Sequence, residues 1–564
     1  MRNLLPSLVL PAVLALAAPA LAQQPNVLLL IADDLGVDRV GAYAAVPDPG
    51  HTPVIDALAA DGVLFRNAWS NPICPPTRAG MLTGRHSRLT GFGATNFWNT
   101  PTELPLAELT IPELLPPAFR SAAVGKWHMG SLKASGYMHP LLQGFEHFRG
   151  TLTIFDASSG DNYTNFTKVV DGTTFVPTTQ YATSNQVDDA LDLIAGWGPE
   201  PWFLWLAFHA PHAPFHKPPA SLHTFGTLPG SVSANIPIHV KAMAEAMDTE
   251  IGRLLGSMDP AVRANTVVIF VADNGTDALA TTAPFLPSHA KGTVYQGGVN
   301  VPLIISGPGV ARGAECEALV GTTDLHATIL ELAGAGPSAA EDSVSLVPYL
   351  SDASLPSLRS SLYTETFLPN GNGPYTSRAR AVRDARYKLM QVFGPSALPT
   401  ETHFFDLLLD PFELNDLLAS PLDAGLQAAF DGLSAELAEP DAPWLEMTYT
   451  GLAGTRGLPA LSGSGSLVAG EAFTLTLTGT LPSAFASLIV GSQNKHLALK
   501  GGVLAPDPAF VLPLVTGPAG QLAVSGHWPP GIPAGFRVLF QYWIDDSGAV
   551  HGWAGSNGLA ATAP

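Results

Sequence analysis

Two apolar runs that end in oxygen-bearing side chains constrain this chain most strongly. PNVLLLIADDLG spans residues 25–36, and NTVVIFVADNG spans residues 265–275. A continuous apolar run of this length is typical of a parallel strand buried on both faces. We therefore expect two core strands whose polar residues lie at their carboxyl ends, which is where ligands gather in open α/β sheets.

Segments with apolar residues at helical spacing separate these strands, at 52–61, 188–196 and 242–255. FLWLAFHAPHAPFH, at 203–216, begins as a further buried strand. Alternation of strands and helices over about 300 residues predicts an α/β layered sheet. We assign residues 23–361 to this α/β domain.

The pattern changes near residue 362, where short antiparallel strands and a final helix are expected through residue 450. The Gly/Ser/Pro-rich stretch 451–466 is typical of a linker. Beyond it, FTLTLTG (473–479) alternates strictly and FRVLFQYWI (536–544) is β-branched and aromatic, so we expect residues 467–564 to form an all-β sandwich module. Carbohydrate binding, attachment to the cell surface and packing against the α/β domain all remain open as its role.

The first 22 residues predict an export signal. Arg2 precedes an apolar run that ends in Ala20-Leu21-Ala22, a small-residue cleavage site. A membrane anchor is the alternative, but Pro6 and Pro11 interrupt the short apolar run. We expect a mature protein that is exported to the periplasm, the cell surface or the medium, with no membrane span after the signal is removed.

Charge and cysteine content exclude several classes. Charged residues make up 13% of the chain and its net charge is -20, which disfavours a nucleic-acid partner or an anionic membrane surface. An anionic substrate would need a local basic pocket. The two cysteines, Cys74 and Cys316, do not indicate a disulfide scaffold.

Oxygen-bearing side chains follow both core strands and suit a hard cation. Asp33 and Asp34 end the first run, and Asp273 and Asn274 end the second. Calcium fits such a set better than magnesium, which usually keeps more of its water. The alternative is that both pairs are ordinary polar exits from strands; their occurrence together favours the metal site.

Basic groups lie in three other motifs. VGKWHMG places Lys126 and His128 two residues apart, so that on an extended segment both side chains face the same way. His212 belongs to the histidine-rich exit of strand 203–216, and Lys291 lies in SHAKGTVYQGG. Each alone is more often structural, but beside a cation they would bind a small oxyanion such as sulfate or phosphate.

With these motifs on view, the chain resembles the sulfatase family of the alkaline-phosphatase-like superfamily over residues 25–440. The most specific segment is PICPPTRAGMLTGR (72–85), which contains the Cys-x-Pro-x-Arg signature as Cys74, Pro76 and Arg78, followed by Leu-Thr-Gly. Other matching segments are NVLLLIADDLG, GKWHMG, FHAPHAP, VVIFVADNG, KGTVYQGGVNVP and LLDPFELNDL. The resemblance implies a mixed, mostly parallel central sheet with helices on both faces and a small antiparallel α+β subdomain.

The resemblance also implies that a maturation enzyme oxidises Cys74 to formylglycine, whose hydrate is the nucleophile. The position suits this role, because prolines fit the first turn of a helix and the amino end of a helix favours negative charge. A buried structural cysteine is the alternative.

Residue roles carry over from the family by position. Asp33, Asp34, Asp273 and Asn274 would hold calcium together with an oxygen on residue 74. Arg78 and Lys126 would steady the hydrate, while Lys126, His212 and Lys291 would contact the sulfate. His212 or Lys291 would protonate the leaving oxygen, and His128 would take a proton from the second hydroxyl so that sulfate is released.

Two departures from the family pattern stand out. Pro75 follows the cysteine where relatives carry a small residue, which bears on recognition by the maturation enzyme. Gln296 and Asn300 replace a glutamate and an arginine that are expected to form a pair in relatives; loss of both leaves no unpaired charge.

The leading hypothesis is therefore an exported sulfatase acting on a sulfated carbohydrate or an aryl sulfate. A phosphodiester or phosphonate monoester hydrolase on the same scaffold is the second candidate, and a catalytically inactive carbohydrate-binding protein is the third. Substrate choice is expected to depend on the loops 130–185, 213–236 and 366–377.

Overall fold

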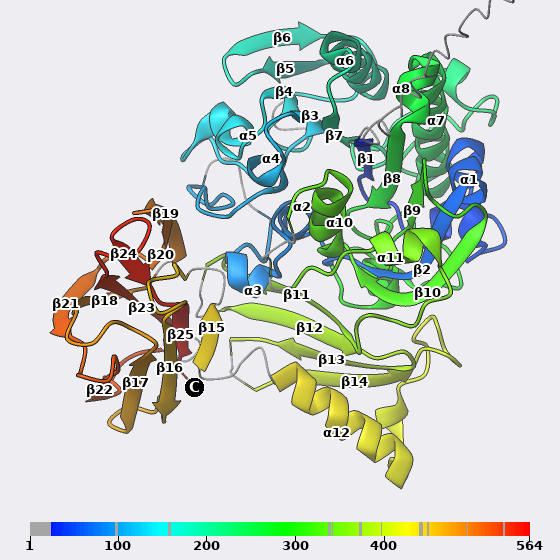
Figure 1. Ribbon diagram of the computed structural model, residues 1–564. Coiled ribbons are helices and arrows are strands. Elements are labelled where there is room, and N and C mark those ends of the chain that lie inside the picture. The colour runs from blue at the N-terminus through cyan, green and yellow to red at the C-terminus, as the bar shows by residue number, and fades with distance from the viewer. Residues whose placement is uncertain are drawn as a thin grey trace, which may run out of the picture.

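A ten-stranded mixed sheet forms the centre of the described chain in this computed structural model (Figure 1). The described residues are 24–95, 100–155, 160–336, 340, 342–371, 375–395, 398–438, 444–447, 451–492, 494–533 and 536–563. The expected signal segment, 1–22, lies outside them. In spatial order the strands are β10 (Ala314–Gly321), β2 (Gly62–Trp69), β9 (Leu303–Ser306), β8 (Thr266–Ala272), β1 (Asn26–Ala32), β7 (Trp202–Ala207), β3 (Arg120–Lys126), β4 (His147–Thr151), β5 (Phe166–Val170) and β6 (Thr174–Thr178).

The centre of this sheet is parallel, as the apolar runs predict. β8, β1, β7, β3 and β4 are parallel neighbours, whereas β9, β5 and β6 join the sheet in antiparallel pairings. Every residue of β1, β7 and β8 is buried, which requires cover on both faces of the sheet. The predicted mixed α/β fold is confirmed.

Helices provide this cover in two groups. α1 (Pro53–Ala60), α6 (Ala182–Trp197) and α7 (Ile236–Ser257) pack together, and α2 (Cys74–Thr83) packs against α10 (Asp324–Leu332). The three helices expected from periodicity correspond to α1, α6 and α7, although α6 and α7 begin six residues earlier than expected. The shorter helices are α3 (Ser87–Thr90), α4 (Ile111–Leu114), α5 (His139–Leu142), α8 (Pro260–Ala264), α9 (Gln296–Val299) and α11 (Val347–Ser351).

A four-stranded antiparallel sheet follows in the chain and lies below the large sheet in Figure 1. Its strands are β11 (Leu362–Leu368), β12 (Ser377–Arg383), β13 (Tyr387–Phe393) and β14 (Glu401–Asp406), and α12 (Ala424–Ala438) packs against it. Successive residues on a strand point to opposite faces. Val382, Leu389 and Phe404 therefore meet α12, while their neighbours Ala381, Met390 and Phe405 pack toward the catalytic domain.

The C-terminal module contains antiparallel sheets and lies at the left of Figure 1. One sheet has the order β15-β25-β23-β18-β21, another has the order β16-β17-β22, and their side chains share a hydrophobic core. The strands are β15 (Trp444–Met447), β16 (Ala460–Gly465), β17 (Ala472–Thr478), β18 (Phe485–Gly491), β19 (Asn494–Leu499), β20 (Gly502–Pro506), β21 (Phe510–Val515), β22 (Leu522–His527), β23 (Arg537–Asp545), β24 (Trp553–Gly555) and β25 (Gly558–Thr562).

The expected linker 451–466 needs correction. Its last residues form β16, which pairs with β17, and β15 joins the module from within the segment expected to close the preceding subdomain. The glycines that suggested a linker serve packing instead. A Cβ on Gly463 would lie 2.1 Å from the indole of Trp444, so glycine makes room for that ring.

The strands β3 and β7 approach each other closely at Gly125. This glycine has φ +94°, and a Cβ there would lie 2.0 Å from the carbonyl oxygen of Ala207. We predict that Gly125→Ala lowers the free energy of unfolding by about 3 kcal/mol, through backbone strain and the clash. Urea denaturation measures this change.

Gly432→Ala is the matched control, because Gly432 lies in α12 with no atom within 4 Å of an added Cβ. It should raise the stability by about 0.5–1 kcal/mol. Equal effects of the two alanines would contradict the close approach of β3 and β7.

Candidate active site

The carboxyl ends of β1 and β8 bring the predicted acidic residues together. The strands are parallel with Ala32 opposite Ala272, so Asp33 and Asp273 leave the sheet side by side. The backbone N–H of Asp34 donates to Oδ1 of Asp273 at 3.3 Å, and Nδ2 of Asn274 donates to Oδ1 of Asp34 at 2.8 Å. All four side chains are buried.

Cys74 faces this cluster from the first residue of α2. Ile73 precedes the helix in an extended conformation, and Pro75 and Pro76 occupy the first turn, where a missing N–H costs nothing. The ligand atoms of Asp33, Cys74 and Asp273 lie within 4.8 Å of one another. The amino end of a helix and two carboxylates thus meet at one side chain.

Arg78 lies one helical turn after Cys74 and therefore on the same face of α2. Its Nε donates to Oδ2 of Asp273 at 2.9 Å, and its NH1 donates to the carbonyl oxygen of Lys126 at 2.7 Å. The side chain is fully buried. Arg78 thereby ties α2 to the ends of β8 and β3.

Lys126, the last residue of β3, bridges the acidic cluster and the cysteine. Its Nζ donates to Oδ2 of Asp33 at 2.5 Å and lies 3.4 Å from Sγ of Cys74. His128 completes the contact, with Nδ1 also 3.4 Å from that sulfur. The expectation that Lys126 and His128 point the same way is confirmed, but the expected extended segment is wrong, because His128 has φ 60°.

Lys291 and His212 approach Asp34 from the more open side. Lys291 Nζ donates to Oδ2 of Asp34 at 2.7 Å, and His212 Nε2 lies 3.8 Å from the same oxygen. His212 Nδ1–H donates to the carbonyl oxygen of Ala213 at 2.6 Å, which directs Nε2 toward the cluster. The side chains of His212 and Lys291 are 13% and 18% exposed, whereas those of Asp33 and Lys126 are fully buried.

Burial and neighbouring charges set the protonation states. Burial would raise the pKa of Asp34, but Lys291 and Lys126 hold it well below its usual value. Burial and the charge of Asp33 raise the pKa of Asp273 to about 6. Burial and nearby cations lower the pKa of His128 well below its usual value, so this imidazole is neutral. Burial also lowers the pKa of His212, to about 4.

These residues fit a divalent cation. Oδ1 of Asp33 and Oδ1 of Asn274 are buried acceptors without a hydrogen-bond partner. Such atoms are costly unless something binds them. The like charges of Asp33 and Asp273 are crowded in the same place, and a cation held by oxygen ligands would satisfy both the charges and the free acceptors.

The other two histidines of strand exit 203–216 do not join this set. His209 Nε2–H donates to Thr151 Oγ1 at 2.8 Å, and His209 Nδ1 accepts from Gln186 Nε2 at 2.7 Å. His216 Nε2 accepts from the Tyr181 hydroxyl at 3.1 Å. The histidine-rich motif could not show which of its members reaches Asp34.

Gln296 and Asn300 bond to different parts of the structure. Gln296 Oε1 accepts from the indole N–H of Trp69 at 2.7 Å, and Asn300 Nδ2 donates to the carbonyl oxygen of Arg66 at 3.4 Å. Neutral side chains at both positions leave no charge to be paired here.

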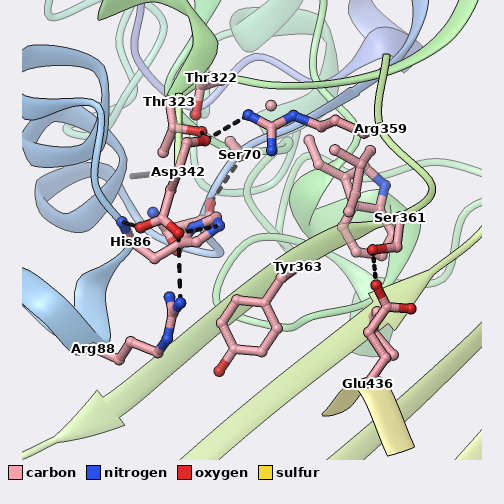
Figure 2. Close-up of a pocket in the computed structure, with 15 residues that line it drawn as sticks. Ser70, His86, Arg88, Thr322, Thr323, Asp342, Arg359, Ser361, Tyr363 and Glu436 are labelled. Carbon is pink, nitrogen blue, oxygen red and sulfur yellow. Dashed lines mark hydrogen bonds and ion pairs between the residues drawn. The ribbon is translucent and has the colours of Figure 1, made fainter. Parts of the chain in front are cut away.

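A cavity of about 320 Å³ lies apart from this cluster, between the ends of β2 and β10 and the strand β11 (Figure 2). The carboxylate of Asp342 lies in its wall. Its Oδ1 is 3.4 Å from NH2 of Arg88, and its Oδ2 accepts from the backbone N–H of His86 at 2.8 Å. The predicted site residues are absent from its walls in the described part of the chain. The cavity marks the contact between the catalytic domain and the four-stranded sheet.

Comparisons with known proteins agree with this geometry. Residues 25–335 match the sequence model of the sulfatase family, and residues 288–439 match the one described as N-sulphoglucosamine sulphohydrolase, C-terminal. The first match covers more than half of the 564 residues. The chain belongs to the sulfatase family, and it is therefore a sulfuric ester hydrolase by class.

Some of the related proteins are sulfatases that are named after a sugar or a polysaccharide. The chain is 34% identical to N-acetylgalactosamine-6-sulfatase of Homo sapiens over 369 residues, which are 59% of this chain and 67% of that protein. It is 27% identical to the Ulvan-active sulfatase of Formosa agariphila over 439 residues, 74% of this chain and 81% of that protein. The match thus spans about two thirds of the length of the human and pig N-acetylgalactosamine-6-sulfatases.

A solved structure supports the fold. The crystal structure of Ps i-CgsB in complex with k-i-k-neocarrahexaose superposes with a TM-score of 0.62 at 24% identity, and the match covers 74% of this chain and 92% of that one. In the described residues, helices lack the combined length and apolar character that a membrane span needs.

The unconverted Cys74 should be chemically inert in the folded protein. Burial raises the pKa of its thiol to about 11, so at pH 7.5 the thiolate fraction is about 1 in 3,000, and only the thiolate is nucleophilic. We predict that iodoacetamide leaves Cys74 unlabelled in native protein made without a maturation enzyme. Peptide mass spectrometry across residues 72–85 reads the result.

A Cys316→Ser background removes the other buried thiol from this experiment. Denatured protein should label fully at Cys74. Labelling of the native protein within minutes at pH 7.5 would show that the thiol is accessible and ionised, against the buried geometry.

Proposed function

We propose that this chain is an exported sulfatase that hydrolyses a sulfate ester of a carbohydrate, with formylglycine made from Cys74 as nucleophile and bound calcium. One observation carries the proposal: Sγ of Cys74 lies 3.4 Å from both Lys126 Nζ and His128 Nδ1, within the group of ligand atoms that includes Asp33 and Asp273. A reactive group built on the Cβ atom of residue 74 would have a cation site on one side and the neutral imidazole of His128 on the other.

The calcium ligands in this proposal are Asp33, Asp34, Asp273, Asn274 and an oxygen on converted residue 74. The bound ion and the aldehyde hydrate would together supply an acidified hydroxyl as nucleophile toward sulfur. The unpartnered Oδ1 atoms of Asp33 and Asn274 are the acceptors available to the ion. Arg78 fixes Asp273 and the end of β3, so it keeps the ligands in place.

Cationic side chains bind and orient the sulfate group. Lys126 and Lys291 carry positive charge, and His212 Nε2 lies beside Lys291 on the accessible side of Asp34. Burial would lower the pKa of Lys291, but Asp34 raises it above its usual value, so this amine is protonated at neutral pH. Lys291, which is protonated, can give a proton to the leaving oxygen directly, whereas His212 can do so only where the bound sulfate raises its pKa from about 4.

His128 accepts a proton at the end of the cycle. Its imidazole is neutral because burial, Lys126 and Arg78 oppose its protonation. Nδ1 lies 3.4 Å from the side-chain atom of residue 74, within reach of a hydroxyl attached to the same carbon. Loss of that proton returns the carbonyl and expels sulfate from the carbon, without a separate attack by water.

A sulfated carbohydrate is the favoured substrate class. The relatives named N-acetylgalactosamine-6-sulfatase and Ulvan-active sulfatase support it, as does a solved neighbour in complex with D-Glucosamine-2-N, 6-O-disulfate, at a TM-score of 0.58. The signal-like residues 1–22 support export, and conversion of Cys74 requires a formylglycine-generating partner enzyme. A phosphonate monoester hydrolase would use the same groups, so turnover of an aryl sulfate against an aryl phosphonate separates the two.

Turnover should depend on residue 74. We predict that protein co-expressed with a formylglycine-generating enzyme and supplied with calcium releases sulfate from 4-nitrophenyl sulfate or a sulfated sugar. Cys74→Ala should lower this rate at least about 10⁴-fold, because the nucleophile is absent. Ion chromatography of sulfate and mass spectrometry of peptide 72–85 measure rate and conversion.

Cys316→Ser is the matched control, since it removes the other buried cysteine and should keep the rate within twofold. Retained turnover in Cys74→Ala would eliminate the proposed nucleophile. An unconverted thiol in protein from the native host would favour a catalytically inactive binding protein.

Calcium binding should depend on Asp33. We predict that Asp33→Asn weakens calcium binding by the converted protein about 100-fold or more, since it removes a charged ligand at a fully buried position. Isothermal titration calorimetry gives the affinity. Asp192→Asn, whose side chain is 70% exposed and pairs with Arg149, should bind calcium as wild type does. Equal affinities in all three proteins would place the ion elsewhere.

A further inference from the structure

The turn that carries His212 is held by one buried hydroxyl. Tyr163 OH lies 2.5 Å from the carbonyl oxygen of His209 and 2.7 Å from that of His212. The two carbonyls belong to one tight turn, in which the N–H of His212 donates to the carbonyl oxygen of His209 at 3.0 Å. Tyr163 is 2% exposed, so water has no ready access to replace its hydroxyl.

The ring of Tyr163 is itself fixed on several sides. His216 lies against it with ring centroids 4.1 Å apart, and Phe155 meets it edge-on at 5.2 Å. The carbonyl oxygen of Tyr163 accepts from the N–H of Ala182, at the start of α6, at 2.7 Å. The hydroxyl of Tyr163 is therefore fixed in place, and it holds the turn at 209–212, which follows β7, by hydrogen bonding.

The far end of the same segment is also gripped. His216 Nδ1–H donates to the carbonyl oxygen of Pro214 at 3.0 Å, and its Nε2 accepts from the Tyr181 hydroxyl at 3.1 Å. Between these anchors, His212 directs Nε2 toward Asp34, 3.8 Å away. The position of that nitrogen thus depends on where the turn at 209–212 lies.

We propose that Tyr163 is a positioning residue for the reaction, which acts by holding the 209–212 turn so that His212 Nε2 faces the sulfate ester. The inference rests on the proposed function, because His212 matters only if an oxyanion binds there. Tyr163 lies 46 residues before His209 and in no motif that the sequence analysis selected. Its hydroxyl has one proton to donate, which serves one carbonyl at a time and keeps both close.

Removal of the hydroxyl leaves the carbonyl oxygen of His212 without this donor and takes the second donor from that of His209, which keeps the N–H of His212. An unpaired buried acceptor is unfavourable, so the turn should shift or open. The ring itself would stay, because its packing against His216 and Phe155 does not use the oxygen. Tyr163→Phe is therefore expected to move His212 without emptying the core.

Tyr43→Phe is the matched control. The hydroxyl of Tyr43 also lies between two carbonyl oxygens, those of Phe65 and Leu303, each at 3.0 Å, and its side chain is also buried. Those carbonyls belong to β2 and β9, outside the candidate active site. Both variants thus remove a buried hydroxyl that lies between two carbonyl oxygens, and Tyr43→Phe also removes the acceptor of the Leu303 N–H, at 2.7 Å.

Hydrogen exchange gives the first test, independent of turnover. In full-length converted protein with calcium, Tyr163→Phe should speed exchange in the peptide 203–216 about tenfold, whereas Tyr43→Phe should leave this peptide unchanged. Unchanged exchange in Tyr163→Phe would show that the hydroxyl does not hold the turn, and would overturn the inference.

A double-mutant cycle with His212→Ala gives the second test. In the wild-type background, Tyr163→Phe should lower kcat for 4-nitrophenyl sulfate about tenfold and change KM less than threefold. In the His212→Ala background, the same substitution should lower kcat less than twofold. If the role of Tyr163 is purely structural, Tyr163→Phe should lower kcat by the same factor in both backgrounds, which is the behaviour expected of the control Tyr43→Phe. An equal factor in both backgrounds would contradict the inference. Absence of turnover in wild type would instead refute the proposed function, while the exchange result would still stand.

Discussion

Three carboxylates buried at one edge of a sheet are the constraint from which the rest of the structure follows. Asp33, Asp34 and Asp273 would repel one another strongly in a dry interior without compensation. The chain supplies a cation for each: Lys126 pairs with Asp33, Lys291 with Asp34 and Arg78 with Asp273. These cations come from β3, a loop and α2, so the acidic cluster fixes how distant segments meet. The free oxygens that remain, Oδ1 of Asp33 and Oδ1 of Asn274, are among the ligands that we assign to calcium.

The same arrangement explains why a cysteine begins α2. Arg78 can reach Asp273 only if the first turn of the helix points into the cluster, and this brings Cys74 to within 3.4 Å of Lys126. As a thiol it is protonated and shielded, which makes it an unreactive side chain until it is converted. On this account, the site places residue 74 for the chemistry of formylglycine, the product of conversion, and the thiol itself has no catalytic role. The four-stranded sheet and the C-terminal module lie outside this cluster, and the module's core is separate from that of the catalytic domain.

Much of this could be predicted from sequence, for identifiable physical reasons. Apolar runs that end in Asp33-Asp34 and Asp273-Asn274 specify buried parallel strands and the edge where their ends meet, and the Cys74 motif identifies the helix. The pairing of each lysine with a particular aspartate depends on strand order, which periodicity does not encode. His128 reaches Cys74 through a left-handed backbone that a non-glycine residue rarely adopts. Tyr163 and the strand β16 were missed because one is an aromatic residue without a motif and the other is glycine-rich.

Anomalous diffraction from a crystal of the converted enzyme grown with calcium tests the central claim most directly. The account predicts one strong peak enclosed by oxygens of Asp33, Asp34, Asp273, Asn274 and residue 74, at the roughly 2.3–2.6 Å typical of calcium. A site without density at this edge of the sheet, or density there while the side chain of residue 74 points away from the ion, would contradict it.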